Sequence, residues 1–264
     1  METHGVAMET RGAVMETLTA RMEELGLSFM SAGLATFLGA SGRGDVPLFD
    51  SIRELVDLEY TARMERMART RLKLSGMPQY KRLDDFDLTW LKGGLPVARF
   101  EELKSLAFVD RKENVVLLGS SGVGKTHLML GLGHHACMSG YSAYHISCRE
   151  AIEKLLKARE QSRLKKTLAW FRKPNVLLLD EVGHEPLSPE QAHVFFQLIN
   201  VRYETGSIVM TSNRPFSKWA ELMSDEAVAT AMLDRLLHHV HVFSLKADSY
   251  RMKERLRVGA VGFD

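Results

Sequence analysis

The stretch that most constrains this chain lies at residues 115–133 and reads VVLLGSSGVGKTHLMLGLG. It contains the pattern G-x-x-x-x-G-K-[ST] from Gly119 to Thr126. In such a loop glycines let backbone N–H groups curl around a phosphate, the lysine adds positive charge at the β- and γ-phosphates, and the threonine hydroxyl can bind Mg²⁺. The apolar run before the loop suits a buried parallel strand, and the run after it suits a helix whose positive end faces the anion. The sequence therefore predicts a nucleotide-binding loop. The residues expected to bind the nucleotide are Gly119, Ser120, Ser121, Gly122, Val123, Gly124, Lys125, Thr126 and His127.

A second motif supports the first. The apolar residues 176–179 are followed by Asp180 and Glu181, as expected where a buried strand ends. Asp180 can hold Mg²⁺ together with Thr126, and Glu181 can orient and polarise the water that attacks the γ-phosphate. Asn213 follows a later strand, so its amide should emerge at the same edge of the sheet and could position that water; a simple turn asparagine in SNRP is the alternative.

After the loop the chain alternates strands and helices, which is typical of a parallel sheet with right-handed crossovers. Including the strand before the loop, five strands are expected, at residues 115–118, 142–147, 175–181, 207–211 and 240–245. Helices are expected at residues 149–171, from a capping box at 188–191, and at 225–237. A further helix at 97–109 should lead into the first strand.

The N-terminal part is different in character. Residues 1–14 carry repeated MET triplets without an apolar seam and are interpreted as a disordered leader, with Met15 as an alternative start. Residues 15–75 are predicted to form a helical domain, with helices over 17–38 and 52–74, and Ser75-Gly76-Met77-Pro78 marks the boundary to a domain at 76–264.

The charge distribution points to a polyanion. The chain has a net charge of only +2, yet residues 63–82 and 157–173 each carry seven Lys or Arg against one Glu, which leaves the remainder acidic. Such basic segments suggest contacts to a phosphate backbone without base reading, and a solvated helix face is the alternative. The residues expected to contact DNA are Arg63, Arg66, Arg69, Lys73, Lys157, Arg163, Lys165 and Lys166.

Several classes are disfavoured. No apolar run approaches the ~20 residues of a membrane span, and no secretory signal is recognisable, so we expect a cytoplasmic protein. Cys137 and Cys148 lack metal-ligand spacing and are expected to be free thiols. The histidines at 238, 239 and 241 alternate across a strand without a carboxylate pair, so we do not expect a metal site there.

The run from LLLDEVGHEPLSPEQAH to LLHHVHVFSLKADSYRMK, within residues 177–253, closely resembles the IstB family of transposition helper ATPases. These are AAA+ proteins related to the helicase loader DnaC and the initiator DnaA. The resemblance covers about residues 15–256, including MEELGLSFMSAGL and the linker LDDFDL, and the N-terminal match is looser. It implies an AAA+ P-loop fold with a reduced C-terminal lid. His184, where the family is expected to have an aromatic residue, is a departure.

The resemblance also implies roles that spacing alone does not. Arg235, which could equally complement a helix dipole, matches the family's arginine finger, acting on the γ-phosphate in a neighbouring subunit. Arg251 resembles the sensor-2 arginine that contacts nucleotide in its own subunit. The implied activity is Mg²⁺-dependent ATP hydrolysis by a homo-oligomer assembled on double-stranded DNA. Such an assembly deforms the DNA and recruits an IstA-type transposase, and hydrolysis drives its disassembly.

Three alternatives remain at this point. A helicase loader of the DnaC type would share the ATPase core but act on single-stranded DNA. A small-molecule P-loop kinase would need an acceptor site and a mobile arginine-rich lid, for which the sequence offers no candidate. A structural DNA-binding oligomer that binds ATP without hydrolysis is disfavoured by Glu181 and Asn213.

Overall fold

The computed structural model describes residues 11–42, 47–91, 95–223 and 226–246. The chain divides into two compact units, Met1–Met67 and Ala68–Asp264. The division falls inside the long helix α3 (Leu48–Leu74), a few residues before the boundary expected at 75/76. Each unit is described by itself below.

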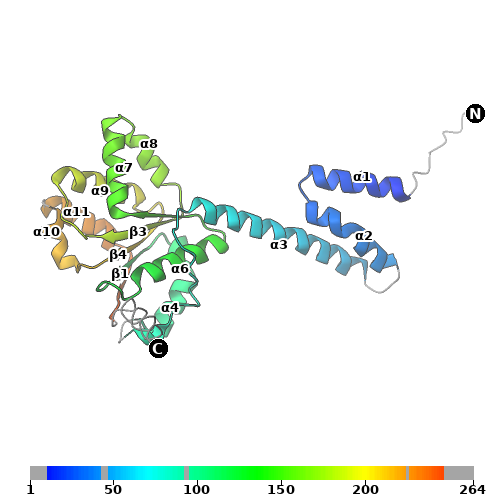
Figure 1. Ribbon diagram of the computed structural model, residues 1–264, viewed down its shortest axis with the longest axis horizontal. Coiled ribbons are helices and arrows are strands. Elements are labelled where there is room, and N and C mark those ends of the chain that lie inside the picture. The colour runs from blue at the N-terminus through cyan, green and yellow to red at the C-terminus, as the bar shows by residue number, and fades with distance from the viewer. Residues whose placement is uncertain (1–10, 43–46, 92–94, 224–225, 247–264) are drawn as a thin grey trace, which may run out of the picture. The chain divides into compact units, whose positions relative to one another are not determined.

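The first unit is helical, with α1 (Arg11–Glu24), α2 (Ser28–Gly42) and the first part of α3 (Figure 1). The expected single helix over 17–38 is interrupted because Gly26 takes a left-handed φ of 72°, which turns the chain between α1 and α2. The buried Glu59 of α3 accepts hydrogen bonds from the N–H groups of Phe29 and Met30 (2.8 and 3.1 Å), which would otherwise be unpaired at the start of α2. Helix α1 begins inside the expected leader, so residues 11–14 are helical, whereas 1–10 lie outside the described residues.

The second unit is built on a five-stranded parallel sheet, as expected. The strands are β1 (Asn114–Leu118), β2 (Ala143–Ser147), β3 (Val176–Val182), β4 (Ser207–Ser212) and β5 (Val240–Ser244), in the order β2-β3-β4-β1-β5. Every neighbouring pair is parallel. All five carboxyl ends therefore lie along one edge of the sheet, where crossover connections begin.

Helices cover both faces of this sheet (Figure 1). One core includes Val116, Leu177 and Met210 and packs against α7 (Cys148–Glu160), α9 (Pro189–Arg202), α10 (Trp219–Met223) and α11 (Glu226–Leu237). The other includes Leu117 and Leu178 and packs against α4 (Val97–Lys104), α5 (Ala107–Asp110) and α6 (Lys125–Met138). Adjacent strand residues thus go to opposite cores, and the sheet is buried on both faces.

In the second unit, the helices that the sequence predicts are present except at two joins. The helix expected over 149–171 is broken into α7 and α8 (Leu164–Phe171) by Ser162, whose φ is 55°. The helix expected over 97–109 ends at Lys104, and α5 follows. The capping box at Ser188 with Pro189 at the first helical position is present at the start of α9. Two short 3-10 turns, Leu88–Trp90 and Phe216–Lys218, complete the described elements.

The remaining sequence expectations concern cysteines and membranes. Cys137 and Cys148 are both buried and free. Over the described ranges, none of the helices combines the length and apolar character needed to cross a membrane.

Candidate nucleotide-binding site

The loop between β1 and α6 has the shape that its glycines predict. Gly124 caps the start of α6 with a φ of 94°, a left-handed conformation that disfavours any side chain. A Cβ at Gly119 would clash with the backbone carbonyl oxygen of Leu245, just after β5. Lys125 is 7% exposed, and its Nζ donates to the carbonyl oxygens of Gly119 and Ser120, both at 2.8 Å. The ammonium is therefore held at the loop, where a phosphate would meet it.

Thr126 and Asp180 are brought together, as expected of a Mg²⁺ site. The Thr126 hydroxyl lies 3.2 Å from both carboxylate oxygens of Asp180. Burial alone would raise the pKa of Asp180, but the nearby His145 ring and hydrogen bonds from Thr211 and Thr126 outweigh it and lower the pKa below its usual value. His145 Nε2 is 4.0 Å from Asp180 Oδ2, so this contact is electrostatic rather than a hydrogen bond. An ionised carboxylate beside a hydroxyl supplies the hard oxygen ligands that suit Mg²⁺.

Glu181 has a left-handed backbone conformation within β3. Its φ is 59°, a left-handed value that costs about 1 kcal/mol for a residue with a Cβ. The register between β3 and β4 shifts between Leu179 and Val182, so Glu181 sits at an irregularity in the ladder. Its N–H donates to Thr211 Oγ1 at 2.9 Å and to Asp180 Oδ1 at 3.1 Å. The side chain is exposed at the carboxyl edge, one residue beyond the carboxylate beside Thr126.

Asn213 lies at the same edge. It follows Ser212, the last residue of β4, which pairs with Leu118 on one side and Val182 on the other. Asn213 is therefore flanked by the strand that enters the phosphate loop and the strand that carries Glu181. Its side chain is exposed and makes no hydrogen bond to the residues that the structure describes. An exposed amide at this position is free to contact a ligand or a water.

Arg235 is at the opposite edge of the sheet. It lies near the end of α11, and the next residue, Leu236, accepts a hydrogen bond from Asn114 Nδ2 at the first residue of β1. The five residues of β1 separate the two edges by about 13 Å, and the phosphate loop begins beyond the far end. Arg235 Nε donates to Asn200 Oδ1 at 2.8 Å, and Nη1 donates to the Ala231 carbonyl at 2.9 Å. Of the expected catalytic residues, Arg235 is the one that this chain does not bring to its own loop.

His127 and Arg251 are two other residues expected to contact the nucleotide, and the structure does not confirm either contact. His127 packs its ring edge-on against Phe86 of the linker (5.6 Å between centroids), and its Nε2 is buried without a hydrogen bond among the described residues. Burial, followed by the charge of Lys81, lowers the pKa of His127. The imidazole thus faces the linker segment. Arg251, the expected sensor-2 arginine, lies outside the described residues.

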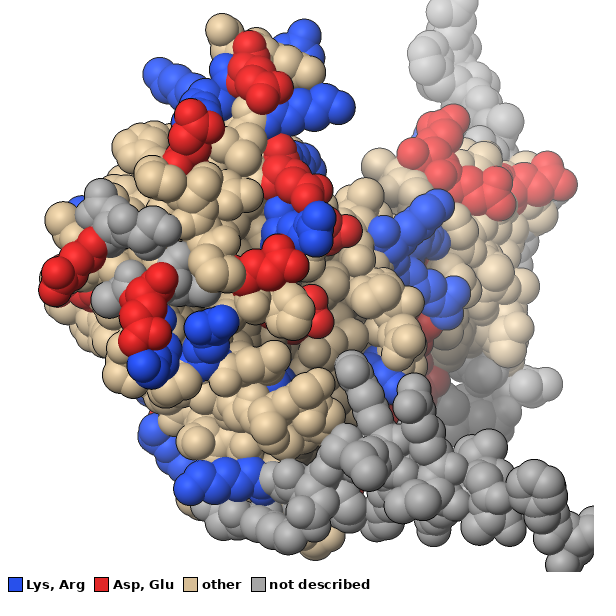
Figure 2. Space-filling model, turned by 60° about the vertical axis from the view of Figure 1, so that its left-hand side comes forward, with Lys and Arg blue, Asp and Glu red and all other residues tan. Residues whose placement is uncertain are grey.

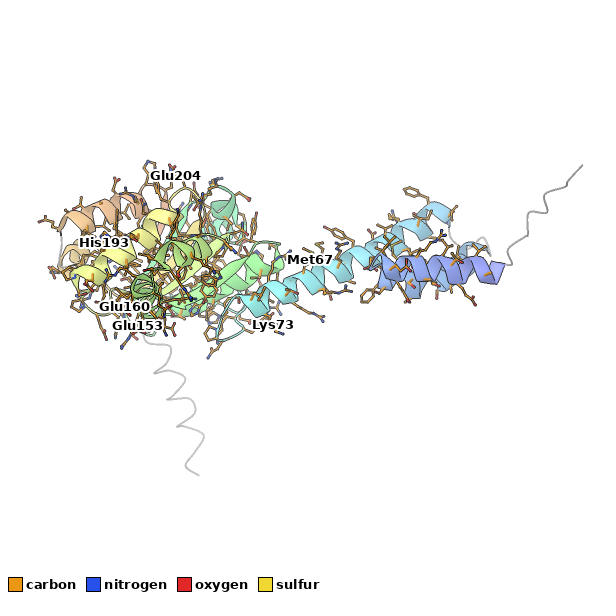
Figure 3. The ribbon with its side chains drawn as sticks, turned by 90° about the horizontal axis from the view of Figure 1, so that it is seen from above. Met67, Lys73, Glu153, Glu160, His193 and Glu204 are labelled. Atoms are coloured by element: carbon orange, nitrogen blue, oxygen red, sulfur yellow. The ribbon has the colours of Figure 1, made fainter. Side chains whose placement is uncertain are left out.

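The residues expected to contact DNA are all exposed. Arg63, Arg66, Arg69 and Lys73 lie on α3, whereas Lys157 lies on α7, Arg163 precedes α8, and Lys165 and Lys166 lie on α8. Helix α7 also carries Glu153 and Glu160, which are labelled with Lys73 in Figure 3. On the face drawn in Figure 2, Lys and Arg side chains lie beside Asp and Glu side chains and do not form a patch of one sign. The basic segments are accessible, but their surroundings are mixed.

Comparison with known proteins identifies the family. The family model described as IstB-like ATP binding protein matches residues 20–258. The chain belongs to the IstB-like ATP-binding protein family. This IstB-like chain is 43% identical over 201 residues to the ATP-binding protein of insertion sequence IS5376 from Geobacillus stearothermophilus, covering 76% of the chain and 80% of the relative. It is 42% identical over 203 residues to that of IS21 from Pseudomonas aeruginosa, covering 77% and 76%.

Solved structures of replication proteins share the fold of this chain. DnaI matches with a TM-score of 0.53 at 21% identity, covering 63% of this IstB-like chain and 91% of that one. The initiator DnaA bound to AMPPCP and single-stranded DNA matches with a TM-score of 0.52 at 23% identity, covering 69% and 56%. At these identities the likeness concerns the fold. The ATP-binding description of the family fits the phosphate loop.

Two residues at the site escaped the sequence analysis. Thr211 is buried in β4 and donates to Asp180 Oδ1 while accepting from the Glu181 N–H. His145, in β2, approaches the same carboxylate. Their positions in sequence carry no motif, and only the pairing of β2, β3 and β4 brings them to Asp180. One signal was available for Thr211: it is a polar residue directly after the apolar residues 208–210 of β4.

Proposed function

We propose that this chain is a Mg²⁺-dependent ATPase that assembles with ATP on double-stranded DNA and regulates the insertion of a mobile DNA element. The observation that carries the proposal is the division of catalytic groups between the two edges of the sheet. Lys125, Thr126, Asp180 and Glu181 lie together at one edge, and the half-buried Arg235 lies at the other, with N–H donors left for a partner.

The side chains at the loop account for binding and for activation of water. Backbone N–H groups of the loop and Lys125 hold the β- and γ-phosphates. Thr126 and Asp180 would hold the Mg²⁺ ion, which would supply positive charge beside the phosphates. Glu181 orients the attacking water and polarises it by accepting a hydrogen bond from it. Asn213 helps to hold the same water in line with the γ-phosphate. Thr211 fixes the N–H of Glu181, so the backbone that carries this carboxylate is positioned before the substrate arrives.

Arg235 supplies the missing cation from a neighbouring subunit. The charge that develops on the γ-phosphate in the transition state needs a donor that the chain's own loop lacks. Arg235 is separated from that loop by the length of a strand, so two protomers arranged head to tail would complete each site. Hydrolysis is then coupled to assembly, because the loop of an isolated protomer lacks the arginine that a neighbour would supply.

The DNA and transposase roles extend the family membership. The relatives named above are encoded in insertion sequences, which move only with a transposase acting on DNA. Exposed cations on α3 and α8 are suited to phosphate contacts that tolerate any sequence. An IstA-type transposase is the partner that would recognise the assembly, and hydrolysis would time its release.

The experiment that tests the proposal uses Glu181→Gln protein, which should bind ATP and stall. It is mixed with matched duplex and single-stranded DNA of about 60 base pairs or nucleotides, and the complexes are sized with ATP and with ADP; the length exceeds a site of several helical turns. Large ATP-dependent complexes on the duplex support the proposal, and stimulation of wild-type ATP turnover by transposase is then measured. Complexes on single strands alone would favour a helicase loader instead, and the absence of any complex would exclude both functions.

A further inference from the structure

Arg235 is held by three neighbours that no function described so far requires. Its Nε donates to the side-chain oxygen of Asn200 at 2.8 Å, and its Nη1 donates to the Ala231 carbonyl one turn earlier in α11. The guanidinium also lies over the Phe196 ring, 5.0 Å from its centroid. Asn200 and Phe196 are one turn apart on α9, which packs against α11 through the core that contains Ile199 and Met232. A rigid part of the fold therefore fixes the side chain.

This arrangement leaves one side of the guanidinium unused. A guanidinium has five N–H donors in a planar fork, one on Nε and two on each Nη. The bonds to Asn200 and Ala231 occupy one N–H on Nε and one on Nη1. The Nη2 pair, together with the second Nη1 donor, makes no further bond to the described residues. These donors have the geometry that binds two oxygens of one phosphate.

The two groups that accept hydrogen bonds from Arg235 are neutral, so they leave the positive charge of the guanidinium available to a phosphate. Within the described ranges, Arg235 has no ion pair with Asp or Glu. An amide oxygen can orient a guanidinium without cancelling its charge, whereas a carboxylate would compete with a phosphate. Asn200 is exposed, so its bond to Arg235 is not demanded by burial. Orientation of the arginine is the role that fits an exposed, neutral acceptor here.

We infer that Asn200 is a positioning residue for Arg235, and that with Phe196 it presents the guanidinium in advance to the triphosphate of a neighbouring subunit. The inference rests on the proposed function, in which Arg235 acts across subunits. An arginine side chain that is already ordered loses less conformational entropy when it engages the phosphate. The benefit belongs to the neighbour's site, so loss of Asn200 should slow turnover without weakening ATP binding by its own chain.

The first test compares Asn200→Leu with a matched control, Gln197→Leu. Gln197 lies one turn earlier on α9 and pairs with His193, which is labelled in Figure 3, rather than with Arg235. Asn200→Leu should lower ATP turnover on duplex DNA by about 10- to 100-fold, because small misplacements of a catalytic group have effects of this size. Its ATP dissociation constant and thermal midpoint should match those of Gln197→Leu, whose turnover should equal wild type. Equal turnover in the two variants would overturn the inference.

The second test assigns the defect to one side of the interface. Equal mixing of Asn200→Leu with Glu181→Gln should restore up to about a quarter of wild-type turnover, since a quarter of random interfaces join an intact loop to an intact Arg235–Asn200 pair. Mixing with Arg235→Ala should restore nothing, because both defects lie on the arginine side. Recovery with Arg235→Ala would overturn the inference alone. Failure of Arg235→Ala to recover with Glu181→Gln would overturn the proposed arrangement across subunits, and this inference with it.

Discussion

The charged side chains at the two edges of the sheet, where its strands begin and where they end, are bonded differently. At the carboxyl edge, neutral groups hold the charged side chains: Asp180 accepts hydrogen bonds from the Thr126 and Thr211 hydroxyls, and Lys125 donates to carbonyl oxygens of its own loop. At the amino edge, Arg202 is 1% exposed and fully committed, whereas Arg235 keeps donors in reserve. The carboxyl edge is thus preassembled for a ligand. The amino edge holds one arginine with a structural role, Arg202, and one with donors left for a ligand, Arg235.

Arg202 and Arg235 differ in how many of their N–H donors are bonded within the chain and in how deeply they are buried. Arg202 donates to five backbone carbonyls, including those of Pro174, Asn175 and Ser207, at 2.6 to 3.3 Å. Burial lowers the pKa of Arg202 to about 10. Arg202 ties the turn before β3 to the start of β4, and its Nε is buried without a hydrogen bond among the described residues. Arg235 makes two bonds and is half-buried. The difference predicts separate consequences for their loss.

The largest effect is expected from Arg235→Ala. Loss of an arginine finger lowers turnover by about 10³- to 10⁵-fold, and ATP affinity should stay unchanged because the residue is remote from its own loop. Turnover on duplex DNA and ATP binding to dilute protein measure the two quantities. Equal mixing with Glu181→Gln should recover activity. A drop in ATP affinity of the dilute variant would place Arg235 at its own site and remove the contrast between the edges.

Arg202→Met should act on stability instead. It leaves five carbonyls short of a donor, and breaking a buried charged network of this kind costs about 3–5 kcal/mol. Urea unfolding followed by circular dichroism measures the loss, and Arg172→Met, an exposed change in the same turn, serves as the control. Any folded fraction should bind ATP normally. A variant as stable as the control, but with slow turnover, would give Arg202 a functional role and weaken the comparison.

Thr211→Val tests the preassembly of the carboxyl edge. The change keeps the shape of the side chain but removes the hydroxyl that fixes both Asp180 and the Glu181 N–H. Turnover should fall about 10- to 100-fold, with a higher Mg²⁺ requirement and little change in ATP affinity. Thr211→Ser should recover most of the activity, and Thr205→Val, in the turn after α9, should have no effect on it. Unchanged turnover and Mg²⁺ dependence would show that the Thr211 hydroxyl is not needed to position Asp180 and Glu181.

The sequence predicted the carboxyl edge better than the amino edge, for a physical reason. The phosphate loop and the strand ending in Asp180 and Glu181 are local patterns, so spacing along the chain determines them. Thr211 depends on register between strands, and Asn200 on the packing of α9 against α11, which no short pattern encodes. The strand order also required the structure. The break between α7 and α8 was missed because Ser162, rather than glycine, takes the left-handed conformation.

The smallest effects are expected away from both edges, where the two basic segments can be compared. Arg63→Ala with Lys73→Ala on α3, and Lys165→Ala with Lys166→Ala on α8, each remove two exposed cations. If each cation contacts one phosphate, the slope of log affinity for duplex DNA against log salt should fall by about one per residue, equally for unrelated sequences. Turnover without DNA should stay at the wild-type level, because neither pair belongs to the edges. Fluorescence anisotropy over a salt series measures the slopes. A slope that falls for one pair alone identifies the segment that carries DNA, and slopes unchanged for both would leave the cations as solvated helix surface.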